Sequence, residues 1–398
     1  MNILWRSCKF AAKLQPLQHP ISITHISSVS PLGSKTEDVW QSYRSGTSFF
    51  SEKHGVKVAA LSKDLEVAIA SLRKENHAYK NLDRAVLLAL LAVKHPQIKE
   101  ILPTERVGVN IGSSRGATSL FESYHKQFIT ENKVSPFTSP TTTTGNISSW
   151  VGQELGLDGI SIDQSVTCST AMHALLNGIA WLQADMADAF IVGGTEAALT
   201  PFTSAQMQAM KLYSKSPNKL ACESMRFQKK KNTMILGEGA AIAVLERGVS
   251  EKTKAVVVGY GFASEALEHN SSISENADCF QKSMQRALTL AELETIDAIV
   301  MHAPGTVKGD KAEKNAIDIV FKNRLPLLTS NKWLVGHTFA ASGILSIEMA
   351  ILMLQHNKFI ENPFFANARH LPKQLKTIMI NAVGFGGNAV SIILQKPS

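Results

Sequence analysis

The sequence predicts an α/β fold built from two halves. Short apolar segments rich in β-branched residues alternate with longer segments whose apolar residues recur every three to four positions, which indicates buried strands and helices packed on the sheets. The expected strands include RVGVNIGSS, DGISIDQSV, DAFIVGG, AAIAVLE, KAVVVGYG, DAIVMHAPG and TIMINAVGFGG. No proline-rich or low-complexity linker divides the chain, and the soft boundary between the halves is ERGVSEKTK at 246–254.

Each half has a helix that begins beside a reactive side chain. In the first half a strand leads to Cys168 and then to TAMHALLNGIAWLQ. In the second half LLTSNKWLVGH leads to His337 and then to TFAASGILSIEMAILML. Both segments start with small residues and carry apolar side chains at helical spacing, so each is expected to bury one face.

Composition and charge exclude several classes of protein. The 398 residues include 41 Lys and Arg against 33 Asp and Glu, a net charge of +8 that favours an acidic partner. The one basic run, KKK at 229–231, lacks the interleaved aromatic residues that stack on bases, so no nucleic acid is expected. The longest apolar run, AVLLALLAV at 85–93, is far shorter than the roughly 20 residues of a membrane span.

The four cysteines lie far apart, without the spacing of a disulfide framework or a metal site. This pattern predicts free thiols in a reducing, cytoplasmic location and no bound metal. The basic opening segment, residues 1–20, is interpreted as an N-terminal extension, with a transit peptide as the alternative.

Cys168 is the candidate nucleophile. At the start of a helix a thiol faces unpaired backbone N–H groups and the positive end of the helix dipole, so its pKa is expected to fall. The same N–H groups could hold the oxyanion that forms when a thiolate attacks an acyl group. The alternative is that Cys168 is a small buried hydrophobic residue without chemistry.

Around Cys168 the chain resembles the β-ketoacyl-acyl-carrier-protein synthases, the type II condensing enzymes of the thiolase superfamily. The resemblance rests on DQSVTCSTAMHAL, SSVSPLG, RVGVNIGSS, VSPFTSPTTTTGN, ADAFIVGGTEAALTPF, LGEGAAIAVLE, VVGYG, DKAEKNAI, NKWLVGHTFAASG and NAVGFGGNAV. These segments occur in the family's order and cover about residues 21–396.

The resemblance implies a thiolase-like, five-layered αβαβα fold made of two pseudo-equivalent halves. Residues 21–250 would form the half with the nucleophilic cysteine, and residues 251–398 the half with both catalytic histidines. The implied activity is an acyltransferase reaction, the decarboxylative Claisen condensation of an acyl-cysteine with malonyl-acyl-carrier protein. Substrates would arrive on the phosphopantetheine arm of an acidic acyl carrier protein, without a metal or redox cofactor.

The resemblance also implies roles for particular residues. Cys168 would carry the acyl group, His302 and His337 would hydrogen-bond the malonyl thioester during decarboxylation, and Lys332 would supply fixed positive charge. Four further positions would bind substrate: Phe385 as a gate whose backbone N–H joins that of Cys168 in the oxyanion site, Thr306 on the phosphopantetheine arm, Arg115 at the end of the acyl pocket, and Phe227 in the basic loop.

The sequence departs from the family's pattern at four places. Pro304 replaces a threonine of the first histidine motif, and Ser346 replaces the glutamate that pairs with the lysine, with Glu348 on another helix face. Arg115 replaces a small or aliphatic residue, which predicts a short, polar or conjugated acyl group or a carboxylate from a partner chain. Acidic residues are missing after Phe227. Together these changes favour specialised polyketide or aryl polyene synthesis over housekeeping fatty acid synthesis.

The alternative functions are those of a thiolase, a transacylase and a partner subunit. A thiolase needs a second cysteine near the C-terminus, and the last cysteine here is Cys279. A transacylase would load Cys168 without decarboxylation. A partner subunit of chain-length type would be half of a heterodimer, although such subunits typically lack the nucleophile. A dimer is expected in each of the family's forms, as a homodimer or with another ketosynthase-like subunit.

Overall fold

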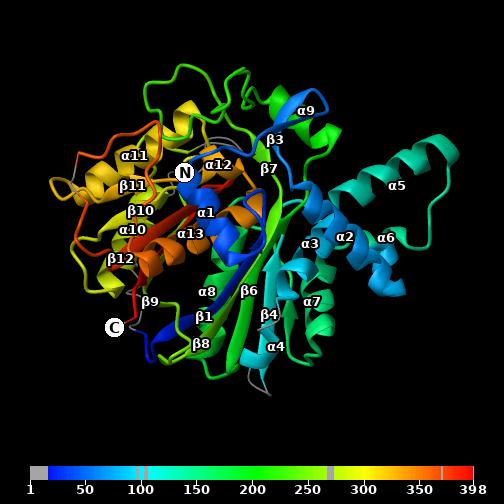
Figure 1. The fold of residues 1–398 in the computed structure, drawn as a ribbon, viewed down its shortest axis with the longest axis horizontal. Helices are drawn as coiled ribbons and strands as arrows, with labels where there is room; N and C mark the ends of the chain where they lie inside the picture. The colour runs from blue at the N-terminus through cyan, green and yellow to red at the C-terminus, as the bar shows by residue number, and fades with distance from the viewer. Residues whose placement is uncertain (1–16, 96–97, 103–105, 267–272, 369–370, 398) are drawn as a thin grey trace, which may run out of the picture.

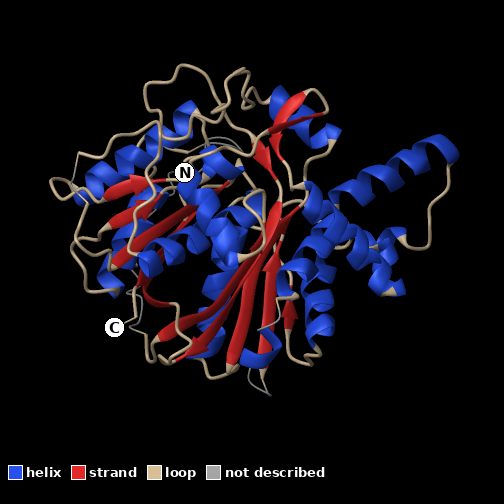
Figure 2. Cartoon of the chain, viewed as in Figure 1, coloured by secondary structure: helices blue, strands red, loops and turns tan. Residues whose placement is uncertain are grey.

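The computed structural model describes residues 17–95, 98–102, 106–266, 273–368 and 371–397, and most of the expected extension at 1–20, with Cys8, lies outside them. Ten of the described strands form one mixed sheet, with the order β11-β10-β12-β13-β9-β1-β8-β6-β4-β5 (Figures 1 and 2). Their bounds are β1 Ile21–Val29, β4 Val107–Gly112, β5 Ser161–Ile162, β6 Ala189–Glu196, β8 Gly239–Arg247, β9 Ala255–Ala263, β10 Ala298–Val300, β11 Leu327–Thr329, β12 Thr377–Gly384 and β13 Asn388–Gln395. A smaller sheet contains β2 Ser51–Lys53, β3 Val56–Ala59 and β7 Leu236–Gly237.

The large sheet consists of two copies of one topology. Numbered within its own half, each set of five strands has the order 3-2-4-5-1: β5-β4-β6-β8-β1 in the first half and β11-β10-β12-β13-β9 in the second. In both sets the first three strands are parallel and the last two are antiparallel to their neighbours. The copies join where Ile21–Ile23 of β1 pairs with Ala255–Val257 of β9. The two halves are therefore pseudo-equivalent, as expected.

The helices complete five layers, as Figure 1 shows. In the middle lie α8 (Thr170–Gln183) and α13 (Ser342–His356), whose apolar residues share one core with both halves of the sheet. The outer face of the first half is covered by α3 (Arg84–Val93) and α7 (Ile147–Leu155), and that of the second half by α10 (Asp278–Leu290) and α11 (Val307–Phe321). The αβαβα fold is confirmed.

Strand β6 shows why these sequences form layers. Phe190 and Val192 face the central helices, whereas Ala189 and Ile191 face α3 and α7. Because side chains alternate along a strand, a fully buried strand must be apolar on both faces.

The central helix α13 is likewise buried on all of its sides. With the short 3-10 turn η3 (Phe339–Ala341) before it, the segment Phe339–His356 is apolar and long enough to cross a membrane. However, 89% of this stretch is buried inside the fold. A helix between two sheets is apolar on all sides, which is the reason for its composition.

Most of the remaining described helices carry exposed residues, whereas all four residues of α12 (Lys332–Val335) are buried. These remaining helices are α1 Thr36–Ser45, α2 Lys63–Glu75, η1 His77–Asn81, α4 Ile98–Ile101, α5 Thr118–Glu131, α6 Thr138–Thr142, η2 Thr144–Asn146, α9 Pro201–Ala209 and α12 Lys332–Val335. Helix α5 projects away from the body, with α6 following it (Figure 1).

Candidate active site

A cavity of about 400 Å³ collects residues from both halves of the chain. Five of the eight residues singled out in the sequence line it: Cys168 before α8, His302 after β10, Thr306 at the start of α11, His337 after α12, and Phe385 between β12 and β13. Most of these positions follow a strand or precede a helix, so the repeated topology brings residues that are distant in sequence to one place.

The Cys168 turn is held in a strained conformation. Thr167 has a φ of +49°, which is costly for a β-branched residue. Its carbonyl accepts hydrogen bonds from Ser114 Oγ at 2.7 Å and Thr170 Oγ1 at 2.6 Å. In addition, Val166 N donates to Thr170 Oγ1 at 2.8 Å, which closes the turn at the helix start. The turn is thus fixed by side chains on both sides.

Gly384 lets the β12–β13 turn approach Cys168. A Cβ atom at Gly384 would lie 2.0 Å from Thr167 Oγ1 and 3.2 Å from Cys168 N, so no larger residue fits without movement. The Thr167 hydroxyl also donates to the Phe385 carbonyl at 3.3 Å. Phe385 therefore lies beside the nucleophile turn.

The expected low pKa of Cys168 is wrong for this structure. Its side chain is buried, and burial followed by the charge of Glu196 raises the thiol pKa to about 12. Lys332 and Arg115 lower the pKa, but by less. Helix α8 begins only at Thr170, so the partial charge of its N-terminus does not outweigh the loss of water. The resting group is a thiol, and its proton must leave as the sulfur attacks.

The two histidines face each other in the cavity. Their ring centroids are 5.3 Å apart at an interplanar angle of 83°. His337 Nδ1 accepts the Phe339 backbone N–H at 3.1 Å, so the neutral ring carries its proton on Nε2. Burial and Lys332 lower the His337 pKa to about 3. Burial, His337 and Lys332 also lower the pKa of His302 well below its usual value. Both rings are therefore neutral at physiological pH and can donate an N–H to an oxygen.

Glu313 holds the segment that follows His302, and the sequence reasoning did not single it out. Its two carboxylate oxygens accept His302 N at 3.0 Å and Ala303 N at 2.9 Å, while Asn381 Nδ2 donates to Oε1 at 3.2 Å. Ala303 has a positive φ of +27°, which the two backbone hydrogen bonds to Glu313 help to hold. Burial raises the Glu313 pKa to about 7. The signal available in the sequence was that Glu313 is the second of two acidic residues in DKAEKNAI, a segment that carries the family resemblance.

Lys332 is buried beside the cavity rather than on its wall. Its ammonium donates to Asn331 Oδ1 at 2.9 Å, and burial lowers its pKa to about 8, against the opposing effect of Glu313. Ser346 Oγ also approaches Asn331 Oδ1, at 3.5 Å. Within the described residues no ion pair involves Lys332, and Asn331 is its side-chain hydrogen-bond partner, consistent with the replacement of the family's glutamate by Ser346.

Glu348 does not replace the missing glutamate. It is buried on another side of α13, next to Ser28 and Tyr43, and burial raises its pKa to about 7. The carboxylates that act on the Lys332 pKa are Glu313 and Asp310.

Arg115 and Phe227 are placed outside the cavity wall. The Arg115 guanidinium donates to Gln206 Oε1 and lies 6.0 Å from the ring centre of Phe339, which does line the cavity. Phe227 packs edge-on against Phe365 at 5.4 Å, within the core of the second half. Arg115 is thus behind the cavity, whereas Phe227 contributes to packing.

Glu196 is a second carboxylate that the sequence reasoning missed. It is fully buried at the end of β6 and accepts Ser113 Oγ at 3.1 Å, Ser114 N at 3.0 Å and Ala340 N at 3.3 Å. It therefore ties the β4–α5 loop of the first half to the segment after His337 in the second. A charged residue ending the apolar run AFIVGGTE was the available signal.

The rest of the cavity wall is largely apolar. It includes Met207, Leu212, Met234, Phe280, Phe339 and Val383. Within the described residues there is no cluster of three or more His, Cys, Asp or Glu side chains that could hold a metal ion.

We predict that alkylation of Cys168 by iodoacetamide is slow at pH 7. Because its pKa is raised, the thiolate fraction and the rate should increase about tenfold per pH unit between pH 7 and 9, without a plateau. Peptide mass spectrometry would follow Cys168, with the buried Cys222 as internal control. A plateau below pH 8 would contradict the raised pKa.

Two family models match the chain. The β-ketoacyl synthase N-terminal domain matches residues 18–250, and the β-ketoacyl synthase C-terminal domain matches residues 254–365. Among curated relatives, 3-oxoacyl-[acyl-carrier-protein] synthase 2 of Coxiella burnetii is 28% identical over 413 residues, covering 94% of this chain and 98% of the relative. The protein of the same name from Staphylococcus aureus is 27% identical over 408 residues, covering 94% and 98%.

Solved structures share the fold at lower identity. The ishigamide ketosynthase/chain length factor has a TM-score of 0.81 and 19% identity, covering 96% of this chain and 100% of that chain. The ketosynthase of Xenorhabdus doucetiae in complex with its chain length factor has a TM-score of 0.78 and 21% identity, with the same coverage. Since the family models together match most of the chain and both of its halves, this chain belongs to the β-ketoacyl synthase family.

Proposed function

We propose that this protein is a β-ketoacyl-acyl-carrier-protein synthase, an acyltransferase that performs decarboxylative Claisen condensation. The observation that carries the proposal is a thiol, Cys168, in one cavity with two neutral, N–H-donating histidines. In this proposal residues 21–250 supply the nucleophile and residues 251–398 supply His302 and His337, after an extension at 1–20.

The first half-reaction is acyl transfer to Cys168. The sulfur attacks the carbonyl of an acyl-carrier thioester, the thiol proton passes to the departing carrier thiol, and an acyl-cysteine remains. The backbone N–H groups of Cys168 and Phe385 would hold the oxyanion, and the close approach at Gly384 supports this arrangement.

The second half-reaction is decarboxylation followed by condensation. Malonyl thioester loses carbon dioxide, and the electron pair of the broken C–C bond forms an enolate whose oxygen accepts N–H groups from His302 and His337. The carbanion then attacks the acyl-cysteine carbonyl, and Cys168 sulfur leaves as a thiolate that takes a proton from water to restore the resting thiol. Neutral histidines suit this role because a donor is needed but a proton must not be lost to the enolate. Lys332 contributes positive charge beside the cavity.

The carrier and its arm would enter on a basic side of the cavity. Thr306, Lys308 and Asn232 line the cavity, and Lys308 and Asn232 also line an adjoining hollow of about 1040 Å³. That hollow is bordered by Lys211, Lys215, Lys230 and Lys231. This charge would attract an acidic acyl carrier protein whose phosphopantetheine arm reaches Thr306 and passes Phe385. No other cofactor is part of the proposed reaction.

Arg115 would set the kind of acyl group that is accepted. Its Nε is buried without a hydrogen-bond acceptor, and within the described residues no carboxylate pairs with the guanidinium. Because Arg115 lies behind Phe339, an acyl group whose oxygen reached past the Phe339 ring would supply the acceptor, and a plain alkyl chain would not. This supports a short, polar or conjugated acyl substrate, as in polyketide or aryl polyene synthesis, over a long saturated one.

The surface supports a dimer. On α5 and the segment that leads into α6, Phe121, Phe128, Ile129, Val134 and Phe137 are 46–68% exposed, and β5 is the last strand of the sheet. An open strand edge and a cluster of exposed apolar residues are each typical of docking surfaces. The occupant would be a second copy or another ketosynthase-like subunit, as in the solved complexes named above.

We expect Cys168→Ala to abolish covalent acylation, seen as loss of the acyl mass shift in intact-protein mass spectrometry with acyl-carrier thioesters. His302→Ala should still acylate but release carbon dioxide from malonyl-carrier about 10²- to 10⁴-fold more slowly, because one enolate donor is lost. If the wild type acylates Cys168 and never releases carbon dioxide, even with a partner subunit, it is a transacylase or a dependent subunit instead.

Arg115→Leu should reverse the acyl preference. We expect the wild type to favour an acyl thioester with a distal oxygen over the alkyl thioester of equal length, and the variant to shift that ratio of acylation rates by about 10- to 100-fold, the effect of one charged hydrogen bond. Arg324→Leu, an exposed arginine paired with Glu294, is the control. An unchanged ratio would contradict the role of Arg115.

Phe128→Asp with Ile129→Asp should convert the dimer into monomers, because two charges would be buried in the contact. Size-exclusion chromatography with light scattering measures this, and Val67→Asp, at a position 69% exposed on α2, is the control. A wild type that is monomeric alone and dimeric only with a second ketosynthase-like subunit would establish the heterodimer.

A further inference from the structure

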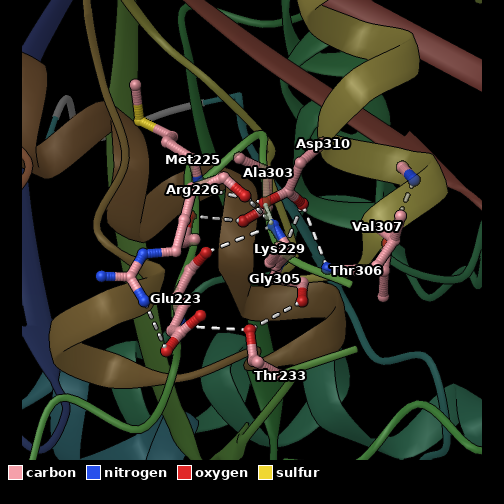
Figure 3. Close-up of polar contacts among 12 residues, drawn as sticks. Glu223, Met225, Arg226, Lys229, Thr233, Ala303, Gly305, Thr306, Val307 and Asp310 are labelled. Carbon is pink, nitrogen blue, oxygen red and sulfur yellow. Dashed lines mark hydrogen bonds and ion pairs between the residues drawn. The ribbon is translucent and has the colours of Figure 1, made fainter. Parts of the chain in front are cut away.

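A buried ion pair lies next to the His302 segment. Lys229 Nζ and Asp310 Oδ2 are 2.6 Å apart, and their side chains are 2% and 0% exposed (Figure 3). Lys229 also donates to the carbonyls of Glu223 at 3.2 Å and Arg226 at 3.3 Å. All three donor positions of this ammonium therefore have an acceptor.

Asp310 connects two loops. It accepts Met225 N at 2.9 Å from the loop that contains Lys229, and Gly305 N at 2.9 Å and Thr306 N at 3.1 Å from the segment after His302. Figure 3 shows these bonds converging on the carboxylate. One buried carboxylate thus joins the basic loop to the segment that carries His302.

We call this connection between residues 223–233 of the basic loop and residues 302–306 the joint, and further hydrogen bonds reinforce it. Ser224 Oγ donates to the Ala303 carbonyl at 2.7 Å, and Thr233 Oγ1 donates to the Gly305 carbonyl at 2.9 Å. The joint holds backbone with positive φ, +27° at Ala303 and +86° at Gly305. Such a conformation persists only where its surroundings determine it.

We propose that Lys229 is a positioning residue for the decarboxylation half-reaction. It keeps Asp310 ionised, and ionised Asp310 holds the segment from His302 to Thr306 in the shape that presents the His302 ring to the malonyl thioester. Without the ammonium, Asp310 would be a buried carboxylate with only backbone donors, and protonating it would weaken its bonds to Gly305 and Thr306.

The Cys168 turn does not depend on this network. Its hydrogen bonds come from Ser114, Thr170 and the Phe385 carbonyl, and none involves Lys229 or Asp310. Loss of Lys229 should therefore slow decarboxylation and leave acylation of Cys168 nearly unchanged. The inference rests on the proposed condensing function.

The test compares Lys229→Met with Lys229→Arg. Both half-reactions would be measured with N-acetylcysteamine thioesters, an acyl thioester for loading of Cys168 and malonyl thioester for carbon dioxide release. These substrates share one thiol arm and need no carrier docking. For Lys229→Met we expect acylation within about threefold of the wild type and a decarboxylation kcat lowered about 10- to 100-fold, the usual effect of a small misplacement. Lys229→Arg should restore most of the rate.

Lys94→Met is the matched control. Lys94 pairs with Glu75 at 2.8 Å and with Glu154 at 3.1 Å, but these pairs are partly exposed and lie in the first half of the chain, away from the basic loop. It should leave both half-reactions unchanged. If Lys229→Met does not fold, Thr233→Val tests the same joint by removing the hydrogen bond to the Gly305 carbonyl. Decarboxylation should again be slowed more than acylation, but by a smaller factor than in Lys229→Met.

Equal loss of acylation and decarboxylation in Lys229→Met, or no loss of either, would overturn the positioning role. A wild type that loads Cys168 and releases no carbon dioxide would instead overturn the proposed function.

Discussion

Buried carboxylates that accept backbone N–H groups hold this active site together. The reacting side chains lie on loops, and the N–H groups of those loops point into a dry interior where they need acceptors. Glu196 holds the loop after β4 and the segment after His337, Glu313 holds His302 and Ala303, and Asp310 holds Gly305 and Thr306. Each carboxylate also reaches a segment far away in sequence, because Glu196 joins the two halves, Asp310 accepts Met225 N and Glu313 accepts Asn381 Nδ2.

This arrangement allows the site to keep strained backbone. Thr167 and Ala303 have positive φ values beside Cys168 and His302, and Gly384 permits an approach that no side chain would tolerate. The rigid support comes from α8 and α13, which are packed between the two halves of the sheet. A large apolar core thus stabilises a small number of unfavourable local conformations where the chemistry is proposed to occur.

Much of the architecture could be predicted from the sequence, because buried strands and central helices have strong apolar patterns. Cys168, His302, His337, Thr306 and Phe385 were singled out by local segments, and these segments do meet in one cavity. Phe227 was placed in the site on the same kind of evidence, yet it packs against Phe365. A motif predicts that a residue is near the site, but the direction of its side chain depends on neighbours from other elements.

The sequence by itself determined the α/β class, the two halves and the order of the candidate reactive residues, since these follow from periodicity and local motifs. Only the tertiary structure decided the electrostatics. Burial made Cys168 a thiol despite its place before a helix, Phe339 N–H selected the tautomer of His337, and Asn331 became the partner of Lys332. These properties depend on desolvation and on the local backbone conformation that the surrounding fold imposes, and neither can be read from the order of residues alone.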